Sequence, residues 1–389
     1  MSLNILIVGA GMYVCGKGTN SFGTIIPALI ELNKKGTDIC VYVAATKTAT
    51  IKEFKNKLNE ANSYMGGNLK VEAYPENVDN PKVYLEVAKK LIGKTCAIVC
   101  TPDHTHYEIT KNLMELNFPC LVVKPLTPTL EEARNLQKIQ EEKDLYCVVE
   151  FHKRFDKSNL MLKDAFESGR IGDPLYFLVE YSQRKEIPES IFKGWSDKTN
   201  IFQYLGVHYV DIIYFVTGAR PLNARALGQK NYLLSKGIDT YDSVEVMIEW
   251  EMNNGFRFNS VFVTNWIDPM NTTALSDQKI KVVGTKGRFE ADQKNRGIMI
   301  VDDAKNEQPN PDFCYFYGYE GKKDARGYGI ESIQTYIYDL FDIYNGNRSR
   351  GSLEAFRPTF LSALISVAVV GAVNQSLGSN GEKVVIEIP

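Results

Sequence analysis

The chain has 389 residues, which is more than one ordinary hydrophobic core contains and favours two domains. Hydrophobic residues make up 44% and charged residues 24%, a mixture typical of a soluble globular protein and unlike that of disordered, fibrous or membrane chains. With 45 basic and 47 acidic side chains the formal net charge is -2, so no long-range field favours nucleic acid or a membrane as a partner.

Strands and helices are expected to alternate over the first 150 residues. The β-rich runs at 4–8, 39–44, 70–73, 96–100, 120–123 and 146–149 are separated by helical stretches that begin near residue 27 or cover 51–62, 81–92, 106–116 and 130–142. A parallel pair of strands needs a crossover connection of about this length. The pattern therefore predicts an α/β domain over residues 1–150, built on a doubly wound parallel sheet of the Rossmann type.

After residue 150 strand-like runs follow one another with few helices between them. They lie at 175–181, 223–229, 243–251, 257–264, 279–283 and 297–301, with turns such as Asn253-Asn254-Gly255. Successive strands joined by such turns indicate an antiparallel sheet. We therefore expect a C-terminal α+β domain with a large open antiparallel sheet over residues 151–389. The boundary near residue 150 is inferred only from the change from alternating strands and helices to successive strands.

A glycine-rich turn, Gly9-Ala10-Gly11, directly follows the first strand. In this context glycines let the backbone turn tightly beside a pyrophosphate, so Gly9, Gly11 and the adjacent Met12 are predicted to bind a dinucleotide. Val14 occupies the usual place of a third glycine, and Gly23 is expected to be its equivalent. Residues 12–22 would then be an insertion, which is either a surface excursion or a loop that contacts phosphate or substrate.

The end of the second strand reads Ala44-Ala45-Thr46-Lys47 and lacks the carboxylate that normally binds the ribose 2'-hydroxyl of NAD. The hydroxyl of Thr46 and the ammonium of Lys47 suit a 2'-phosphate, which favours NADP over NAD. The alternative is that Lys47 is simply solvated.

Four segments resemble, in order, motifs of the Gfo/Idh/MocA family, which includes glucose-fructose oxidoreductase and inositol dehydrogenase. They are Thr101-Pro102-Asp103-His104-Thr105-His106 for its TPxxxH turn, Val123-Lys124-Pro125 for its EKP motif, Phe151-His152-Lys153-Arg154-Phe155 for its domain junction and Gly206-Val207-His208-Tyr209-Val210-Asp211 for its GxHxxD element. The matches span about residues 4–220, and together they are more specific than any one of them.

The resemblance implies a Rossmann domain, a C-terminal domain with an open antiparallel sheet, and a homodimer or homotetramer formed through that sheet. It implies that Lys124 is the proton-transferring residue and that His208 holds the reacting hydroxyl. The expected cofactor contacts from this part of the chain are Thr101, Pro102, Asp103, His106 and Lys124. A lysine can act as the base because burial lowers its pKa from about 10.4 towards neutrality.

Each predicted site residue could instead have a purely structural role. His208 lies in an apolar segment and could be a core residue, while Asp211 could orient it or only pair locally. His152 either contacts substrate or packs between domains. Two departures from the family are Val123, in place of a glutamate, and Tyr204, in place of an aspartate. Tyr204 could bind a substrate oxygen, or its presence could mean that catalysis is lost.

The sequence predicts an NAD(P)-dependent oxidoreductase that moves a hydride between nicotinamide and a hydroxyl or keto carbon of a sugar, cyclitol or nucleotide-sugar. The alternative is a catalytically silent NAD(P)-binding sensor of the same fold. The seven cysteines show no CxxC spacing and are expected to be reduced, no metal site is expected, and the short apolar start lacks a basic leader. We therefore expect a cytoplasmic protein.

Overall fold

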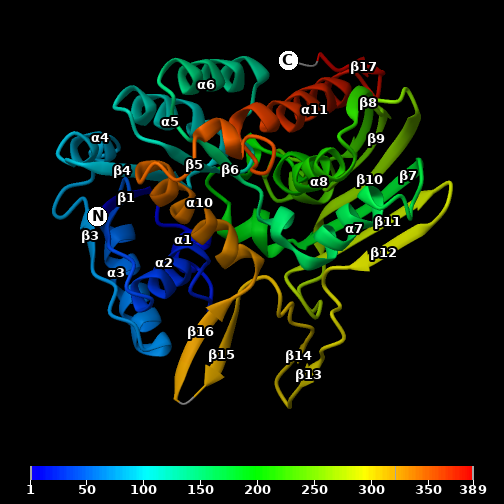
Figure 1. The fold of residues 1–389 in the computed structure, drawn as a ribbon. Helices are drawn as coiled ribbons and strands as arrows, with labels where there is room; N and C mark the ends of the chain where they lie inside the picture. The colour runs from blue at the N-terminus through cyan, green and yellow to red at the C-terminus, as the bar shows by residue number, and fades with distance from the viewer. Residues whose placement is uncertain (1, 320, 388–389) are drawn as a thin grey trace. The chain divides into compact units, whose positions relative to one another are not determined.

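The computed structural model of this chain describes residues 2–319 and 321–387 (Figure 1). Contacts between residues divide it into two compact units. The first unit contains residues 1–127, 131–155 and 312–362, and the second contains residues 128–130, 156–311 and 363–389. The prediction that everything after residue 150 belongs to a second domain differs from this division, because residues 312–362 pack with the first unit.

The first unit is built on a six-stranded sheet in the order β3-β2-β1-β4-β5-β6. Each neighbouring pair of strands is parallel. The strands are β1 (Leu3–Val8), β2 (Ile39–Ala44), β3 (Val71–Tyr74), β4 (Lys94–Val99), β5 (Cys120–Val123) and β6 (Val148–Glu150). This confirms the predicted doubly wound parallel sheet, whose strands are predicted well because they are short buried runs of β-branched residues.

Helices connect these strands and cover the sheet (Figure 1). They are α1 (Met12–Cys15), α2 (Ile25–Lys34), α3 (Thr48–Met65), α4 (Val83–Ala88), α5 (His106–Glu115) and α6 (Leu130–Glu142). The chain returns to this unit late, as the hairpin β15 (Tyr315–Tyr319) and β16 (Lys322–Arg326) and the helix α10 (Tyr328–Tyr344). The sequence patterns did not predict this return.

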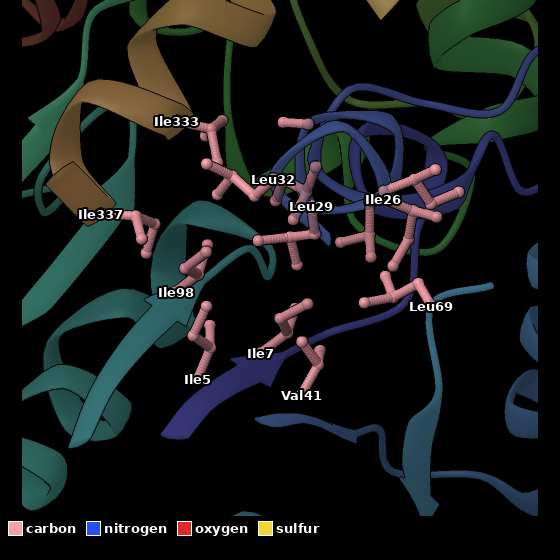
Figure 2. Packing of buried hydrophobic residues seen from close by; sticks show 14 of the residues in the cluster. Ile5, Ile7, Ile26, Leu29, Leu32, Val41, Leu69, Ile98, Ile333 and Ile337 are labelled. Carbon is pink, nitrogen blue, oxygen red and sulfur yellow. The ribbon is translucent and has the colours of Figure 1, made fainter. Parts of the chain in front are cut away.

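Helix α10 forms part of the core of the first unit. Ile333 and Ile337 are fully buried, and Figure 2 shows them beside Leu29 and Leu32 of α2 and above the strands that carry Ile5 and Ile98. A second attachment is polar, because the buried carboxylate of Glu31 in α2 accepts a hydrogen bond from the backbone N–H of Ala325 at 2.9 Å. The segment 312–362 is therefore a structural part of the Rossmann unit.

The second unit contains a seven-stranded sheet in the order β12-β11-β7-β10-β9-β8-β17. Its strands are β7 (Pro174–Arg184), β8 (Arg220–Gln229), β9 (Ser243–Glu251), β10 (Arg257–Asp268), β11 (Ser276–Gly284), β12 (Arg288–Asp292) and β17 (Val384–Val385). The prediction of an antiparallel sheet needs one correction, because β7 and β10 are parallel. Neither neighbour of β7 is joined to it by a hairpin, so turn signals could not fix its direction.

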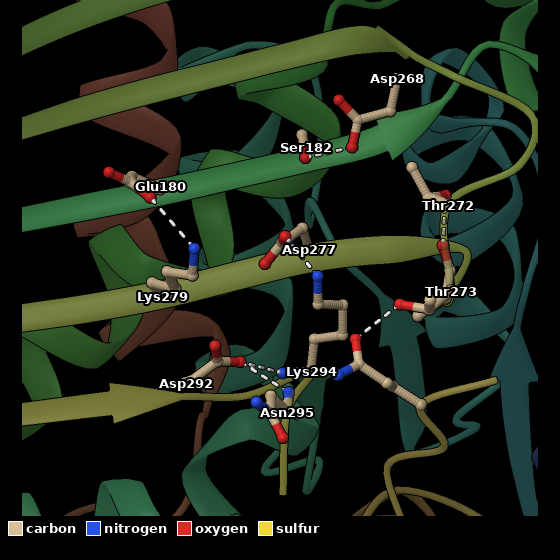
Figure 3. Close-up of polar contacts among 12 residues, drawn as sticks. Glu180, Ser182, Asp268, Thr272, Thr273, Asp277, Lys279, Asp292, Lys294 and Asn295 are labelled. Carbon is tan, nitrogen blue, oxygen red and sulfur yellow. Dashed lines mark hydrogen bonds and ion pairs between the residues drawn. The ribbon is translucent and has the colours of Figure 1, made fainter. Parts of the chain in front are cut away.

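The run at 297–301 also differs from its predicted place. Its strand β13 (Ile300–Val301) pairs only with β14 (Asn306–Glu307), in a separate two-stranded sheet. The helices of the second unit are α7 (Lys157–Glu167), α8 (Val207–Thr217), α9 (Tyr232–Ser235) and, for most of its length, α11 (Phe360–Gly378). Polar pairs add to the strand contacts (Figure 3), including Asp277 with Lys294, whose oxygen and nitrogen are 2.6 Å apart.

Helix α11 is, among the described residues, the one helix long and apolar enough to cross a membrane. However, 67% of that stretch is buried inside the structure, as in the core helix of a globular protein. Length and composition alone are therefore weak evidence for a membrane span.

The packing of α10 can be tested by replacing Ile333 with alanine. We expect Ile333→Ala to lower the free energy of unfolding by about 3 kcal/mol, because it leaves a cavity in a closely packed core. The measurement is urea unfolding followed by circular dichroism. Tyr338→Ala is the matched control on the exposed side of the same helix and should change stability by about 0.5 kcal/mol or less. Equal effects of the two variants would contradict the packing role.

Candidate active site

The strands of the first unit end beside one another at the carboxyl edge of the sheet, where open α/β sheets bind ligands. Gly9 follows β1, Cys100 follows β4, Lys124 follows β5, and Glu150 is the last residue of β6. Because β1 is next to β4, β4 is next to β5 and β5 is next to β6, these residues belong to one edge. The structure therefore brings the glycine turn and the predicted base into a single region.

Gly9 is required by the close approach of two strand ends. Its φ is +109°, and a Cβ there would lie 2.0 Å from the backbone oxygen of Cys100. Gly11 differs, because a Cβ at this position would meet no atom within 4 Å. Gly23 again has a positive φ, +69°, and lies against the backbone of Val14 and Cys15. The turn thus combines a fixed backbone at Gly9 with open space beside Gly11.

Residues 12–22 form the short helix α1 and a loop that is held against α3. The ammonium of Lys57 donates to the backbone oxygen of Thr19 at 2.8 Å, and Lys17 donates to Thr50 at 3.0 Å. Lys17 also lies 3.6 Å from Glu53. The loop is therefore an ordered part of the first unit, and its predicted contact with phosphate or substrate stays a prediction.

The region after β2 contains a carboxylate that the sequence patterns did not reveal. Asp79, from the segment after β3, accepts hydrogen bonds from the backbone N–H and the hydroxyl of Thr48 at 2.8 and 2.9 Å. These hydrogen bonds lower the pKa of Asp79, so it is charged at neutral pH. It therefore places a negative charge at the start of α3, next to the predicted cofactor residues Thr46 and Lys47.

His106 joins two strand ends of the site. It is fully buried, and its Nε2 lies 2.8 Å from the backbone oxygen of Thr101 while its Nδ1 lies 2.8 Å from that of Pro125. Carbonyl oxygens only accept hydrogen bonds, so a protonated ring satisfies both of them and a neutral ring satisfies one. His106 thereby fixes the backbone on either side of the predicted base. Its predicted contact with the cofactor stays a prediction, as do those of Pro102 and Asp103.

Lys124 is half-buried immediately after β5. Burial disfavours the ammonium form and lowers the pKa of Lys124 from 10.5 to about 8. The negative charges of Asp103 and, secondarily, Glu150 act in the opposite direction and limit the decrease. A lysine with this pKa exists in both protonation states near neutral pH, as an acid–base group must.

A buried polar network stands beside Lys124, and most of it was not predicted. The carboxylate of Glu150 lies 2.8 Å from Nδ1 of His152 and accepts a 2.6 Å hydrogen bond from the hydroxyl of Ser332. The hydroxyl of Tyr13 lies 3.4 Å from the same His152 nitrogen. The imidazole also stacks with Tyr328, their ring centroids 5.6 Å apart. Only His152 of this group was among the predicted site residues.

The remaining predicted residues lie in the second unit. His208 and Asp211 are buried on α8, and Tyr204 precedes that helix within the short π-helix η5 (Phe202–Gly206). The ring of Tyr204 stacks on Trp266 with 5.8 Å between centroids. Their catalytic and substrate contacts stay predictions.

Metal chemistry finds no support in the described part of the chain. Over residues 2–319 and 321–387 no group of three or more His, Cys, Asp or Glu side chains could hold a metal ion. The seven cysteines, all of which lie in that part, are free thiols.

The bridging role of His106 can be tested by His106→Leu. Removing the ring breaks its contacts with the backbone oxygens of Thr101 and Pro125, so we expect the free energy of unfolding to fall by about 2 kcal/mol or more. The neighbouring His104 is exposed, and His104→Leu should change stability by about 0.5 kcal/mol or less. Chemical unfolding of both variants measures the difference, and an equally stable His106→Leu protein would contradict the bridge.

Curated relatives of this chain include inositol dehydrogenases. It is 22% identical over 324 residues to myo-inositol 2-dehydrogenase of Thermotoga maritima, covering 83% of this chain and 87% of that protein. It is 25% identical over 221 residues to inositol 2-dehydrogenase of Rhizobium meliloti, covering 56% and 63%. A third relative, the uncharacterized oxidoreductase YhhX of Escherichia coli, is 33% identical over 124 residues, which is 32% of this chain and 35% of that protein. Two of these three matches therefore span less than two thirds of the relative.

Solved structures share the fold over nearly the whole length. Scyllo-inositol dehydrogenase of Lactobacillus casei, solved with NAD(H) and scyllo-inositol, has a TM-score of 0.70 at 14% identity, with 99% of both chains covered. Myo-inositol 2-dehydrogenase of Lactobacillus plantarum has a TM-score of 0.70 at 17% identity, with 100% of both chains covered. At these identities the likeness concerns the fold alone.

Family models match both parts of the chain. The oxidoreductase family with an NAD-binding Rossmann fold matches residues 3–151, and the GFO/IDH/MocA C-terminal domain matches residues 159–290. These ranges include the glycine turn, Lys124 and His208. The chain belongs to the GFO/IDH/MocA oxidoreductase family.

Proposed function

We propose that this protein is an NAD(P)-dependent oxidoreductase that interconverts a secondary hydroxyl and a keto group on a cyclitol, sugar or nucleotide-sugar. The observation that carries the proposal is Lys124, a half-buried lysine at the carboxyl edge of a Rossmann sheet whose pKa is lowered to about 8. The inositol dehydrogenases among its relatives support a polyhydroxylated ring as the substrate class.

The residues of the first unit fit a dinucleotide. A Cβ at Gly11 would meet nothing within 4 Å, so the backbone after β1 is open to close approach by a ligand. Gly9, Gly11 and Met12 would hold the pyrophosphate, with Gly23 closing the loop, and Thr101, Pro102, Asp103 and His106 would line the nicotinamide side. The bound nicotinamide supplies the hydride acceptor or donor.

Lys124 performs the proton transfer. In the oxidising direction its neutral amine accepts the proton of the reacting hydroxyl, and in the reducing direction its ammonium returns a proton to the carbonyl oxygen. His208 and Tyr204 would orient the reacting hydroxyl, and His152 would contact the substrate. Since proton transfer requires hydrogen-bond distance, the substrate oxygen must bind next to the amine of Lys124.

The preferred cofactor depends on charges after β2. We propose NADP(H), because Thr46 and Lys47 offer a hydroxyl and an ammonium to a 2'-phosphate. The carboxylate of Asp79 opposes this preference, since it would repel a 2'-phosphate and suits a 2'-hydroxyl. Single substitutions can remove the charge of Lys47 or that of Asp79, so the two effects can be measured separately.

We further propose that the protein works in the cytoplasm on a small carbohydrate and assembles into a homodimer or homotetramer through the sheet of its second unit. The neutral overall charge and free thiols agree with this setting.

The assignment of Lys124 can be tested with Lys124→Met, which keeps the length of the side chain and removes the amine. Turnover of inositols or sugars should fall at least about 100-fold, because the proposed proton acceptor is removed. The affinity for the reduced cofactor, measured by fluorescence titration, should be unchanged. In the wild type the rate of oxidation should rise with pH up to about 8 and then level off, because the neutral amine is the base.

The rate of reduction should show the opposite dependence and decline above pH 8, because it requires the ammonium. A variant with near wild-type turnover would refute the role of Lys124. Tight cofactor binding by the wild type without turnover of any inositol, sugar or nucleotide-sugar would instead favour a cofactor-binding sensor.

The cofactor preference can be tested by titrating NADPH and NADH. We expect NADPH to bind more tightly, Lys47→Ala to weaken NADPH binding about tenfold through loss of a charged hydrogen bond, and Asp79→Asn to strengthen it. Lys138→Ala, which removes an exposed lysine on α6, is the matched control and should leave both affinities unchanged. Tighter binding of NADH by the wild type would show that Asp79 outweighs Lys47.

A further inference from the structure

We propose that Glu150 is a positioning residue of this site, whose buried carboxylate keeps Lys124 protonated in the resting enzyme. This inference deepens the proposed function, since it concerns how the proposed base is controlled. It is carried by the register of β5 and β6 and by the network that holds Glu150.

The register places Glu150 beside the base. Val123, the last residue of β5, is paired with Glu150, the last residue of β6, and Lys124 directly follows β5. The two strands are parallel, so both residues are at the same edge of the sheet. The side chain of Glu150 is almost fully buried. A buried carboxylate needs nearby positive charge or hydrogen-bond donors, and this site offers both.

Three side chains hold the carboxylate in place. One oxygen accepts the 2.6 Å hydrogen bond from the hydroxyl of Ser332, and the other lies 2.8 Å from Nδ1 of His152. The hydroxyl of Tyr13 is a third donor, and burial together with Glu150 raises the pKa of Tyr13 well above its ordinary value. Tyr13 therefore stays protonated and can only donate to a charged carboxylate. These contacts give the buried carboxylate of Glu150 hydrogen-bond partners on both of its oxygens.

The acidic groups around Lys124 come from the strand ends on either side of β5. Cys100 and Asp103 follow β4, and Glu150 ends β6; a negative charge on any of them favours the ammonium over the amine. Burial raises the pKa of Cys100 to about 12, so it is neutral at pH 7. Around Glu150 itself the titratable groups include Lys124, His152, Tyr13 and Cys100. Glu150 and Asp103 are thus the negative charges that balance the burial of Lys124.

The network also connects the base to the glycine turn. Tyr13 lies two residues after Gly11, on α1, and its hydroxyl reaches the Glu150–His152 pair. Ser332 comes from α10, 182 positions away in the sequence. Segments from three parts of the chain therefore fix one carboxylate next to Lys124.

The test follows the charge of Lys124 without requiring turnover. The purified full chain is labelled with a trace of acetic anhydride from pH 6 to 10, and mass spectrometry measures acetylation of Lys124, which proceeds only through the neutral amine. In Glu150→Gln we expect the midpoint of this labelling to move down by about one pH unit, which is about tenfold faster labelling at pH 7, because one stabilising negative charge is lost. If turnover can be measured, the pH profile of oxidation should shift equally.

Glu150→Asp is the matched control, because it keeps the charge, and its labelling midpoint should stay within about 0.3 pH units of the wild type. An unchanged midpoint in a folded Glu150→Gln protein, or an equal shift in both variants, would overturn the proposal. If Glu150→Gln does not fold, the double variant Tyr13→Phe/Ser332→Ala leaves the carboxylate with fewer donors, so its charge acts more strongly on Lys124 and the midpoint should move up. No shift in that variant would likewise overturn it. A labelling shift without any turnover would refute the proposed function and leave the role of Glu150 intact.

Discussion

The structure of the first unit depends on the burial of one face of α10 against α2 and the parallel sheet. Ile333 and Ile337 fill space above β1 and β4 that the first 155 residues leave open. The same packing fixes the other face of α10, so Ser332 meets Glu150 and Tyr328 meets the ring of His152. Apolar packing far from the chemistry thus sets the positions of polar side chains within it.

Burying Lys124 has a cost in stability that depends on pH. Its pKa in the folded protein, about 8, is below its ordinary value of 10.5, so between these pH values the folded state binds fewer protons than the unfolded state. The contribution of Lys124 to the free energy of unfolding therefore increases as the pH rises from about 8 to 10.5. At neutral pH the folded protein holds a partly buried ammonium, and Asp103 and Glu150 offset part of the cost. Lysines with pKa values lowered in this way are more frequent at functional sites than elsewhere in proteins, which agrees with the proposed role of Lys124.

Much of the Rossmann unit could be predicted from the sequence because its signals are local. Strand β5 is an apolar run of four residues, and Lys124 lies in a motif that follows it. The partners of Glu150 could not be predicted in this way, because Ser332 depends on long-range packing and Tyr13 depends on the path of α1 after the glycine turn. Asp79 was missed for the same reason, since its bonds to Thr48 join the segment after β3 to the start of α3. Local patterns also could not give the direction of β7 relative to β10.

The register between β5 and β6 also bears on the departure at Val123, where the family motif has a glutamate before the lysine. Val123 carries no charge, but its partner across the strand pair is Glu150. A carboxylate on the neighbouring strand can act on Lys124 as strongly as one on the same strand, because electrostatic interaction depends on distance and burial and not on sequence position. The loss of one motif residue is therefore weak evidence for loss of activity when the fold brings the same chemical group to the site from another strand.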